Sequence, residues 1–303
     1  KTVSEGVYNQ LVFDNAGNAI ANNELEDNRS IERNFVLAGF GMSWKKSKSL
    51  EWTANLSQNY RSVTFSDIRV VSPSFKVDAD IKDESGFTFD TGIRGRLDKI
   101  LSYDFTIYSM LYNDRIGIVL DDRANRVRKN IGQAVIAGTE TLVTINALKL
   151  WSPNDQNKDL NLFANAAFTY SKYLESEESN VVGNTVEFIP SVNLKTGVSY
   201  RLRNFEASYQ FTYLSQQFTD VQNSAAAIAG DKRDGLIGSI PAFSVSDAHF
   251  SYRFRRMKLA FSINNLWDQS YFTRRALGYP GPGIIPSEGR AFFISLTYSN
   301  KDS

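Results

Sequence analysis

The sequence predicts an all-β protein, an antiparallel transmembrane β-barrel with about twelve strands present. Three observations favour this class: long segments in which apolar and polar residues alternate, connections of two lengths that take turns along the chain, and aromatic residues near strand ends. Alternation with a period of two places successive side chains on opposite faces of a strand. A sheet with lipid on one face and water on the other shows this pattern.

The expected strands are long for a soluble domain. Residues 290–298 alternate clearly, and residues 50–61 alternate over about a dozen positions, whereas strands in soluble domains have about 5 or 6 residues. Two further segments, 3–12 and 133–148, show a weaker pattern. The other expected strands cover residues 36–45, 87–97, 101–111, 160–173, 194–202, 205–216, 245–255 and 257–264.

The connections between these strands fall into two classes. Long connections are expected at residues 14–34, 62–85, 114–132, 174–191, 217–242 and 266–289, and they alternate with short or moderate ones at 46–49, 98–100, 152–159, 203–204 and 255–256. Outer-membrane barrels have short periplasmic turns and longer extracellular loops. We therefore expect a protein of the bacterial outer membrane, with extracellular long loops and a periplasmic C-terminus.

The side chains of the apolar phase fit this placement. Strands 50–61 and 87–97 carry no Lys or Arg in that phase, and a slip of strand 87–97 by one residue would turn Asp90, Arg94 and Arg96 toward lipid. A basic residue near the bilayer midplane costs about 2 to 4 kcal/mol. Aromatic residues of the apolar phase gather beside the short turns, where we expect a periplasmic girdle: Trp44, Tyr103, Tyr200, Phe205, Phe254 and Tyr298. A soluble sandwich or β-helix also alternates, but strand length and the two classes of connection oppose it.

Composition excludes several other classes. The 34 Lys and Arg nearly balance the 33 Asp and Glu, so no general attraction to nucleic acid is indicated. The absence of cysteine excludes disulfides and thiolate metal sites. No apolar run approaches the roughly 18 residues of a membrane helix. No signal peptide is visible from Lys1 onward.

Catalytic residues are scarce. His249 is the only histidine, so a Ser/His/Asp arrangement must use it, and its place in the water-facing phase is more typical of a solvated lumen residue. One histidine without cysteine cannot form an N/S metal cluster, although carboxylate-only sites stay open. The phosphate-binding and dinucleotide-binding glycine motifs are missing. The sequence therefore predicts a protein that is not an enzyme and holds no cofactor.

Arginine-rich loop segments are the candidate ligand site. Arginine forks grip carboxylates and phosphates through paired, charge-assisted hydrogen bonds, which suits an anionic ligand at a barrel mouth. Loop solvation or contact with anionic surface lipid is the alternative interpretation of the same residues. The candidates are Arg115, Arg123, Arg126, Arg128, Arg274 and Arg275, with Lys129 beside them and with Gln216 and Gln217 at the lip of another long loop.

Several short motifs resemble a known family. The segment YRSVTFSD at residues 60–67, NLWD at 265–268, YFTRR at 271–275 and GPG at 281–283 are similar to the β-barrel of TonB-dependent outer-membrane receptors, most closely the ferric citrate receptor type. The resemblance spans essentially the whole chain. Two departures are Trp267, where Phe is usual, and the five residues that follow Tyr298, where such barrels commonly end on an aromatic residue.

The resemblance implies a 22-stranded barrel closed by an N-terminal plug, of which this chain corresponds to the second half. Residues 1–298 would form the barrel domain and residues 299–303 a tail. The implied function is the import of a ferric chelate, iron citrate or a similar siderophore, as the transported ligand. The implied partners are outer-membrane lipid and the TonB complex, which would act through a plug that this chain does not contain.

An autonomous barrel of about twelve strands, acting as a porin or a membrane-embedded hydrolase, is the alternative. Pairing of residues 3–12 with residues 290–298 would close such a barrel. Two unpaired edges would favour the half-barrel, because exposed strand edges are a liability. In either case the polar phase would line a wet path with Asn55, Asn59, Asp90, Arg94, Asn161, Asn165, Lys195 and Gln210.

Overall fold

The computed structural model describes residues 2–4, 7–13, 19–26, 29–68, 75–120, 126–225, 235, 238–276 and 283–299. For residues before 32 and for Leu120 it gives the course of the backbone only. Every structural statement below concerns these residues.

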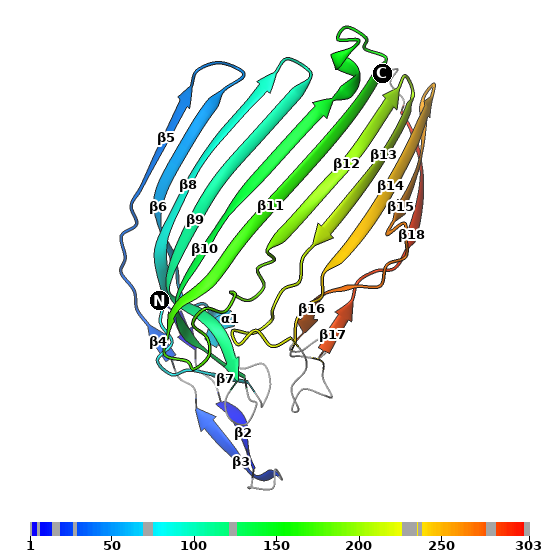
Figure 1. The fold of residues 1–303 in the computed structure, drawn as a ribbon. Coiled ribbons are helices and arrows are strands. Elements are labelled where there is room, and N and C mark those ends of the chain that lie inside the picture. The colour runs from blue at the N-terminus through cyan, green and yellow to red at the C-terminus, as the bar shows by residue number, and fades with distance from the viewer. Residues whose placement is uncertain are drawn as a thin grey trace.

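One large curved sheet forms the body of the protein (Figure 1). Eleven strands follow one another as antiparallel neighbours in the order β18-β15-β14-β13-β12-β11-β10-β9-β8-β6-β5, and the short strand β7 (Phe75–Val77) adds to β10 in parallel. These eleven strands are β5 (Gly39–Lys45), β6 (Glu51–Arg61), β8 (Glu84–Leu97), β9 (Leu101–Leu120), β10 (Arg126–Asn146), β11 (Lys158–Ser176), β12 (Val192–Leu202), β13 (Phe205–Leu214), β14 (Phe243–Phe254), β15 (Met257–Asn264) and β18 (Ala291–Tyr298).

The remaining elements lie at one end of this sheet (Figure 1). They comprise two separate two-stranded antiparallel sheets near the N-terminus, a third after β15, and a single helical turn after β6. Their bounds are β1 (Thr2–Ser4) with β4 (Arg29–Ile31), β2 (Val7–Phe13) with β3 (Ala19–Glu26), β16 (Phe272–Ala276) with β17 (Gly283–Pro286), and α1 (Phe65–Ile68). At the opposite end, the 3₁₀ helix η1 (Ala147–Leu150) lies between β10 and β11.

The sheet is a single layer with an exposed apolar face. Trp44, Phe89 and Ile107 are about half exposed and Phe40 is more exposed still, and no second layer covers them among the described residues. The soluble sandwich considered above is therefore wrong. Side chains on the other face are polar and pair across strands, as Asn55 does with Asp90 through a hydrogen bond of 2.9 Å from Nδ2 to Oδ1.

The register extends this division of faces over the sheet. Asn165 lies opposite Lys195, and Gln210 lies opposite Asp247, so the predicted lumen residues of neighbouring strands share one face. Two register shifts interrupt the β9–β10 pair near Gly132, where Asp114 adopts a positive φ of 53°. A bulge of this kind changes which side chains face inward beyond it.

Two sequence-based expectations were wrong in detail. Residues 3–12 do not contribute a wall strand, because β1 and β2 pair with β4 and β3 instead of with the large sheet. Residues 114–132 are for the most part not a loop, because β9 runs to Leu120 and β10 begins at Arg126. The alternating pattern fades there because both faces of this extension are covered by other parts of the chain, so both carry apolar side chains.

The sheet is open. β5 pairs only with β6 and β18 only with β15, so each has one unpaired edge among the described residues. The short connections lie at the end of the sheet where the described chain ends, and the long ones lie at the opposite end (Figure 1). No helix in the described part of the chain is long and apolar enough to cross a membrane.

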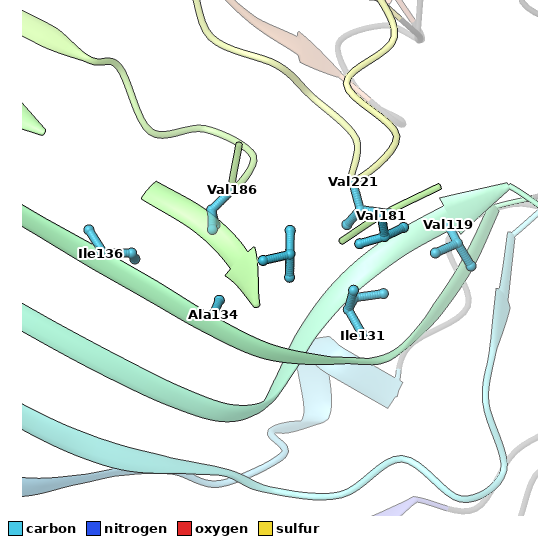
Figure 2. Close-up of a cluster of buried hydrophobic side chains, with 8 residues drawn as sticks. Val119, Ile131, Ala134, Ile136, Val181, Val186 and Val221 are labelled. Atoms are coloured by element: carbon cyan, nitrogen blue, oxygen red, sulfur yellow. The ribbon is translucent and has the colours of Figure 1, made fainter. Parts of the chain in front are cut away.

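Two apolar clusters fix the long-loop end. In the first, Val181 and Val186 from the connection after β11, together with Val221 from the connection after β13, pack against Ile131 and Ala134 of β10 (Figure 2). In the second, Val63, Ile68 and Ile81 from the β6–β8 connection pack with Ile116 of β9. The first cluster holds the connections after β11 and after β13 against the inner face of the sheet. The second holds α1 close to the ends of β6 and β9.

Candidate ligand-binding site

A polar cavity of about 480 Å³ lies at the long-loop end of the sheet. Its floor comes from the ends of β6, β8, β9 and β10, and its sides come from α1 and from the connections after β11 and β13. The charged side chains that line it are Arg61, Arg115, Arg128, Asp67, Glu84 and Glu187, and the uncharged lining includes Asn59, Tyr60, Ser85, Tyr112, Phe188 and Thr219. Three arginines and three carboxylates therefore face one space.

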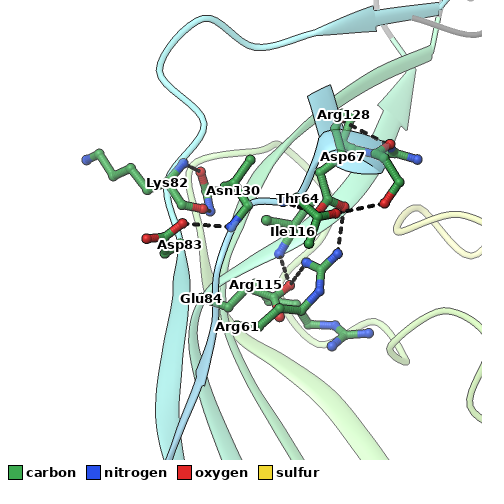
Figure 3. Close-up of polar contacts among 12 residues, drawn as sticks. Arg61, Thr64, Asp67, Lys82, Asp83, Glu84, Arg115, Ile116, Arg128 and Asn130 are labelled. Carbon is green, nitrogen blue, oxygen red and sulfur yellow. Dashed lines mark hydrogen bonds and ion pairs between the residues drawn. The ribbon is translucent and has the colours of Figure 1, made fainter. Parts of the chain in front are cut away.

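Arg61 bridges two carboxylates (Figure 3). Its Nη2 donates to Oδ1 of Asp67 at 2.6 Å, and its Nη1 lies 3.2 Å from Oε1 of Glu84. Glu84 is buried and also accepts a hydrogen bond of 2.6 Å from the backbone N–H of Ile116. The side chain of Arg61 nevertheless keeps 45% of its surface exposed, so part of the guanidinium remains open to a ligand.

Asp67 is the acidic centre that ties α1 to the strands. Its Oδ2 accepts hydrogen bonds from the backbone N–H of Thr64 at 2.9 Å and from the Thr64 hydroxyl at 2.7 Å. Burial alone would raise the pKa of this carboxyl, but the bonds from Thr64 and the charge of Arg61 outweigh it and hold the pKa below its ordinary value. Asp67 is therefore ionised at neutral pH.

Arg115 is a largely buried cation of the cavity that interacts with Tyr173 and lies 5.4 Å from the ring centroid of Tyr112. It lies on β9 just beyond the bulge, its side chain is 18% exposed, and its Nη2 is 3.9 Å from Oε1 of Glu187, which is too long for a hydrogen bond. Its buried Nε has no hydrogen-bond partner among the described residues. Glu187 is held in place by the Tyr173 hydroxyl, which donates to Oε2 at 2.7 Å. A buried guanidinium with an unused donor favours an additional acceptor.

Arg128 closes the cavity beside α1. Its Nη1 donates to the backbone carbonyl oxygens of Ser66 at 2.6 Å and Asp67 at 3.1 Å, and its guanidinium lies 5.0 Å from the ring centroid of Phe75. These contacts fix the guanidinium against the helical turn. Arg128 therefore contributes positive charge from a fixed position more than free donors.

The other predicted site residues lie elsewhere. Arg126 is half-buried on β10 opposite Leu120 and is not among the cavity residues, and Arg123 lies outside the described residues. Gln216 is exposed, whereas the backbone of the buried Gln217 forms a bridge with Ile240. Thus Arg126 and Arg128 are strand residues rather than loop residues, as the extension of β10 requires.

Arg274 and Arg275 belong to the β16–β17 hairpin and also lie outside the cavity. Arg274 is exposed. Arg275 donates through Nη1 to the carbonyl oxygen of Gly235 and through Nη2 to that of Ser239, the latter at 2.9 Å. Its contacts hold the connection after β13 against the hairpin, which is a structural role.

Comparison with known proteins places this geometry in a family. A family model described as TonB dependent receptor-like, beta-barrel matches residues 8–266. The chain belongs to this family. TonB-dependent receptor barrels are outer-membrane proteins that act as receptors and transporters, not as enzymes.

Solved structures of similar fold are also receptors or transporters. The ferric citrate transporter FecA in its unliganded form has 23% sequence identity and a TM-score of 0.69 over 93% of this chain and 39% of FecA. The copper transporter OprC has 18% identity and a TM-score of 0.64 over 95% of this chain and 42% of OprC. The ferric yersiniabactin uptake receptor FyuA from Yersinia pestis has 14% identity and a TM-score of 0.63 over 93% and 39%. This TonB-dependent receptor barrel thus spans about two fifths of the length of these structures.

Sequence reasoning missed four charged residues of the cavity, namely Arg61, Asp67, Glu84 and Glu187. Arg61 and Glu84 lie in the inward phase of their strands, directly opposite each other in the register, and this pairing could have been found by aligning the two strands. Glu187 carried no signal, because it lies in a long connection whose course depends on the apolar cluster beneath it. The receptor site is assembled by strand ends more than by loop tips.

Neither catalytic nor metal-binding groups stand out in the described part of the receptor barrel. His249 Nδ1 lies 2.8 Å from the hydroxyl oxygen of Ser262, but no carboxylate hydrogen-bonds its ring. Within the same residues, no three His, Asp or Glu side chains lie close enough together to hold a metal ion. The cavity presents guanidinium donors of the kind that bind anions.

Proposed function

We propose that this chain forms the ligand-binding part of a TonB-dependent receptor that imports a ferric chelate, iron citrate or a similar anionic siderophore. The observation that carries the proposal is Arg115, a largely buried guanidinium with an unused Nε donor in a cavity shared with two more arginines. The chelate is the transported ligand, and no protein cofactor takes part. The ferric citrate transporter FecA has a similar fold, which supports the choice of iron citrate as the first ligand to test.

The cavity favours an anionic ligand that competes with the carboxylate of Glu187 for the guanidinium of Arg115. Three arginines and three carboxylates leave the lining side chains without net charge, so simple attraction is not enough. Arg61 is held by Asp67 and Glu84 at short range, but Arg115 meets Glu187 only at 3.9 Å. A ligand carboxylate at hydrogen-bonding distance would interact with Arg115 more strongly than Glu187 does. We infer that ligand binding takes over Arg115 from Glu187.

Transport requires parts beyond this chain. The two open edges at β5 and β18 suit further wall strands, and the polar inner face suits a wet path. In this proposal the long connections face the cell exterior and the C-terminus faces the periplasm. The TonB complex supplies energy through a plug domain inside the completed wall. TonB dependence is tested by uptake of radiolabelled ferric citrate in cells with and without TonB, where loss of TonB abolishes uptake but leaves surface binding unchanged.

Ligand binding is tested by titrating the full-length protein in detergent with ferric citrate. Arg115→Gln removes a charge-assisted donor and weakens binding by roughly 10- to 100-fold, because hydrogen bonds to charged groups contribute about 1.5 to 3 kcal/mol. Glu187→Gln removes the competing charge but keeps an acceptor for Tyr173, and it strengthens binding by roughly tenfold. The matched control is Lys82→Gln, an exposed residue outside the cavity.

The two variants separate folding from binding. A loss of affinity in Arg115→Gln alone would also result from a damaged site, whereas a gain in Glu187→Gln requires a working one. Unchanged affinity in both variants, with normal folding, would exclude this cavity. Equal affinity for ferric citrate and for a neutral chelate would exclude the anionic ligand. Binding of a copper complex in preference to both would point to a different metal cargo, such as that of the copper transporter OprC.

A further inference from the structure

The end of the sheet that carries the short connections has a large surplus of positive charge. We define the short-turn rim as the five short connections with three residues of strand on either side: residues 43–53, 95–103, 144–160, 200–207 and 252–259. This rim contains 13 Lys and Arg but only 5 Asp and Glu, whereas the whole chain has 34 and 33. The rest of the chain is therefore acidic, and the charges are separated along the strands.

The carboxylates of the rim are for the most part engaged by neighbouring cations. Asp159 pairs with Arg201 and, at 3.3 Å, with Lys149, and the Glu206 carboxylate lies 3.5 Å from Lys258 Nζ. Glu51 pairs with Arg94 at 2.8 Å. Four of the five acidic side chains of the rim, those of Glu51, Asp155, Asp159 and Glu206, thus already have basic partners and neutralise little of the remaining charge.

Other basic side chains of the rim project into the surroundings. Lys46, Lys48, Arg203 and Arg255 are exposed, and none has an acidic partner within 4 Å among the described residues. Arg255 instead lies 5.3 Å from the ring centroid of Phe254. These four residues come from three different connections, so the exposed charge is spread over the rim.

The same rim carries exposed aromatic side chains. Trp44 is 56% exposed, Trp151 77%, Phe254 58% and Tyr298, which ends the neighbouring edge strand, 64%. Aromatic residues of this kind concentrate where the hydrocarbon of a bilayer meets its headgroups, and basic residues beside them reach anionic headgroups. A surface that carries both aromatic and basic groups is therefore better suited to contact with lipid than to full exposure to water.

We propose that the short-turn rim binds anionic phospholipid headgroups of the membrane leaflet in which it lies. The aromatic rings would lie at the level of the glycerol backbone, and Lys46, Lys48, Arg203 and Arg255 would contact the phosphodiester groups from the aqueous side. The expected partner is a lipid whose headgroup contains a phosphodiester and has a net negative charge. A bilayer surface offers such headgroups to the basic turns and acyl chains to the outward aromatic rings at the same time.

The test is native mass spectrometry of the full-length protein released from micelles that contain equal amounts of phosphatidylglycerol and phosphatidylethanolamine. The unaltered protein retains phosphatidylglycerol in preference. Lys46→Gln with Lys48→Gln lowers the bound ratio of the two lipids by roughly tenfold or more, and Arg203→Gln with Arg255→Gln does the same. The matched control is Lys82→Gln with Lys172→Gln, two basic residues near the opposite end of the sheet, and it leaves the ratio unchanged.

Several outcomes would overturn the proposal. An equal ratio for the unaltered protein and both rim variants would mean that the rim does not select anionic lipid. An equal fall in the control would mean that overall charge, not the rim, sets the ratio. In micelles to which lipopolysaccharide is also added, its retention in preference to phosphatidylglycerol through the same residues would assign the rim to a different lipid. Ferric citrate binding is not expected to change in either rim variant, so this test is independent of the proposed import function.

Discussion

The Nη2 atom of Arg61, at the end of β6, lies 2.6 Å from Oδ1 of Asp67 in α1. Only six positions separate the two residues, yet the contact turns the chain back over the inner face of the wall. Asp67 in turn presents its backbone carbonyl oxygen to Arg128, so one helical turn links two arginines of different strands. The ionisation of Asp67 therefore adds to the apolar contacts of Ile68 in holding α1 at the side of the cavity.

The first prediction concerns pH. The pKa of Asp67 is held below its ordinary value, so its contribution to stability is fully present above the unfolded-state pKa of about 3.9 and is lost as pH falls through the folded-state pKa. Asp67→Asn lowers the local stability of α1 at pH 7 by about 1 to 2 kcal/mol, discounted because Arg61 is half exposed. Hydrogen exchange of residues 62–68 between pH 7 and pH 3 measures the effect.

The control for this prediction is Asp80→Asn, at an exposed carboxyl in the turn after β7. It leaves the exchange of α1 unchanged at every pH. If Asp67→Asn keeps the full acid sensitivity of the unaltered protein, another carboxyl governs α1. Asp83, whose pKa is also held low by its bonds from Arg33, Tyr60 and Val63 against the effect of burial, would then be the residue to test.

The second prediction concerns the two long connections over the inner face. Asn223, after β13, accepts a hydrogen bond from the backbone N–H of Thr185 and donates one to its carbonyl oxygen, each at 2.8 Å. Asn223→Ala removes both, and the protein loses about 2 kcal/mol of protection against local opening, at roughly 1 kcal/mol for each bond. Hydrogen exchange of residues 181–188 and 217–224 then becomes faster by roughly 30-fold, while global unfolding changes little.

Asn154→Ala is the matched control, because Asn154 is exposed in the β10–β11 connection at the opposite end of the sheet. Faster exchange in only one of the two connections would mean that they open separately. In that case the Asn223 bonds do not couple the two connections, and apolar contacts of Val181 and Val221 with β10 hold each of them separately.

The long strands of the large sheet were predictable from sequence, whereas the structure at the long-loop end was predictable only in part. Strands such as β6 and β8 place apolar and polar residues on opposite faces at most positions, so the period-two pattern identifies them. The loop-end extension of β9 and β10 is covered on both faces, and a strand covered on both faces loses its alternation. Arg115 and Arg128 were therefore expected in a loop although they lie on strands. The proposed ligand roles of all the predicted arginines and glutamines stay predictions.

The third prediction tests close approach between strands. A Cβ atom on Gly86 of β8 would lie 1.8 Å from the backbone carbonyl oxygen of Leu111 on β9, and a backbone atom cannot move aside without breaking the strand pair. Gly86→Ala therefore reduces the yield of folded protein severely. Gly41→Ala is the matched control, since its Cβ would meet only the end of the Asn55 side chain, at 2.6 Å. The folded fraction is measured by the mobility of unheated and heated protein in detergent gels, and equal yields for the two variants would mean that β8 shifts to accept the extra atom.

The fourth prediction distinguishes the two faces of the wall by a pair of neighbouring residues. Ile107 on β9 is 46% exposed on the apolar face, and Thr106 is half-buried on the polar face. Ile107→Arg places a guanidinium among lipid chains near the middle of the strand and costs about 2 to 4 kcal/mol, whereas Thr106→Arg places the same group in water at a cost near zero. The free energy of unfolding in lipid vesicles, measured by guanidinium titration, should differ between the variants by that amount.

The comparison is informative because local strand propensity and charge are identical in the two variants. Only the surroundings of the guanidinium differ, so a difference in stability reports the medium on each side of the sheet. Equal destabilisation would mean that both faces meet the same medium. A larger loss for Thr106→Arg would mean that the polar face is the more tightly packed one, as it would be if a further part of the protein filled the interior at the depth of Thr106.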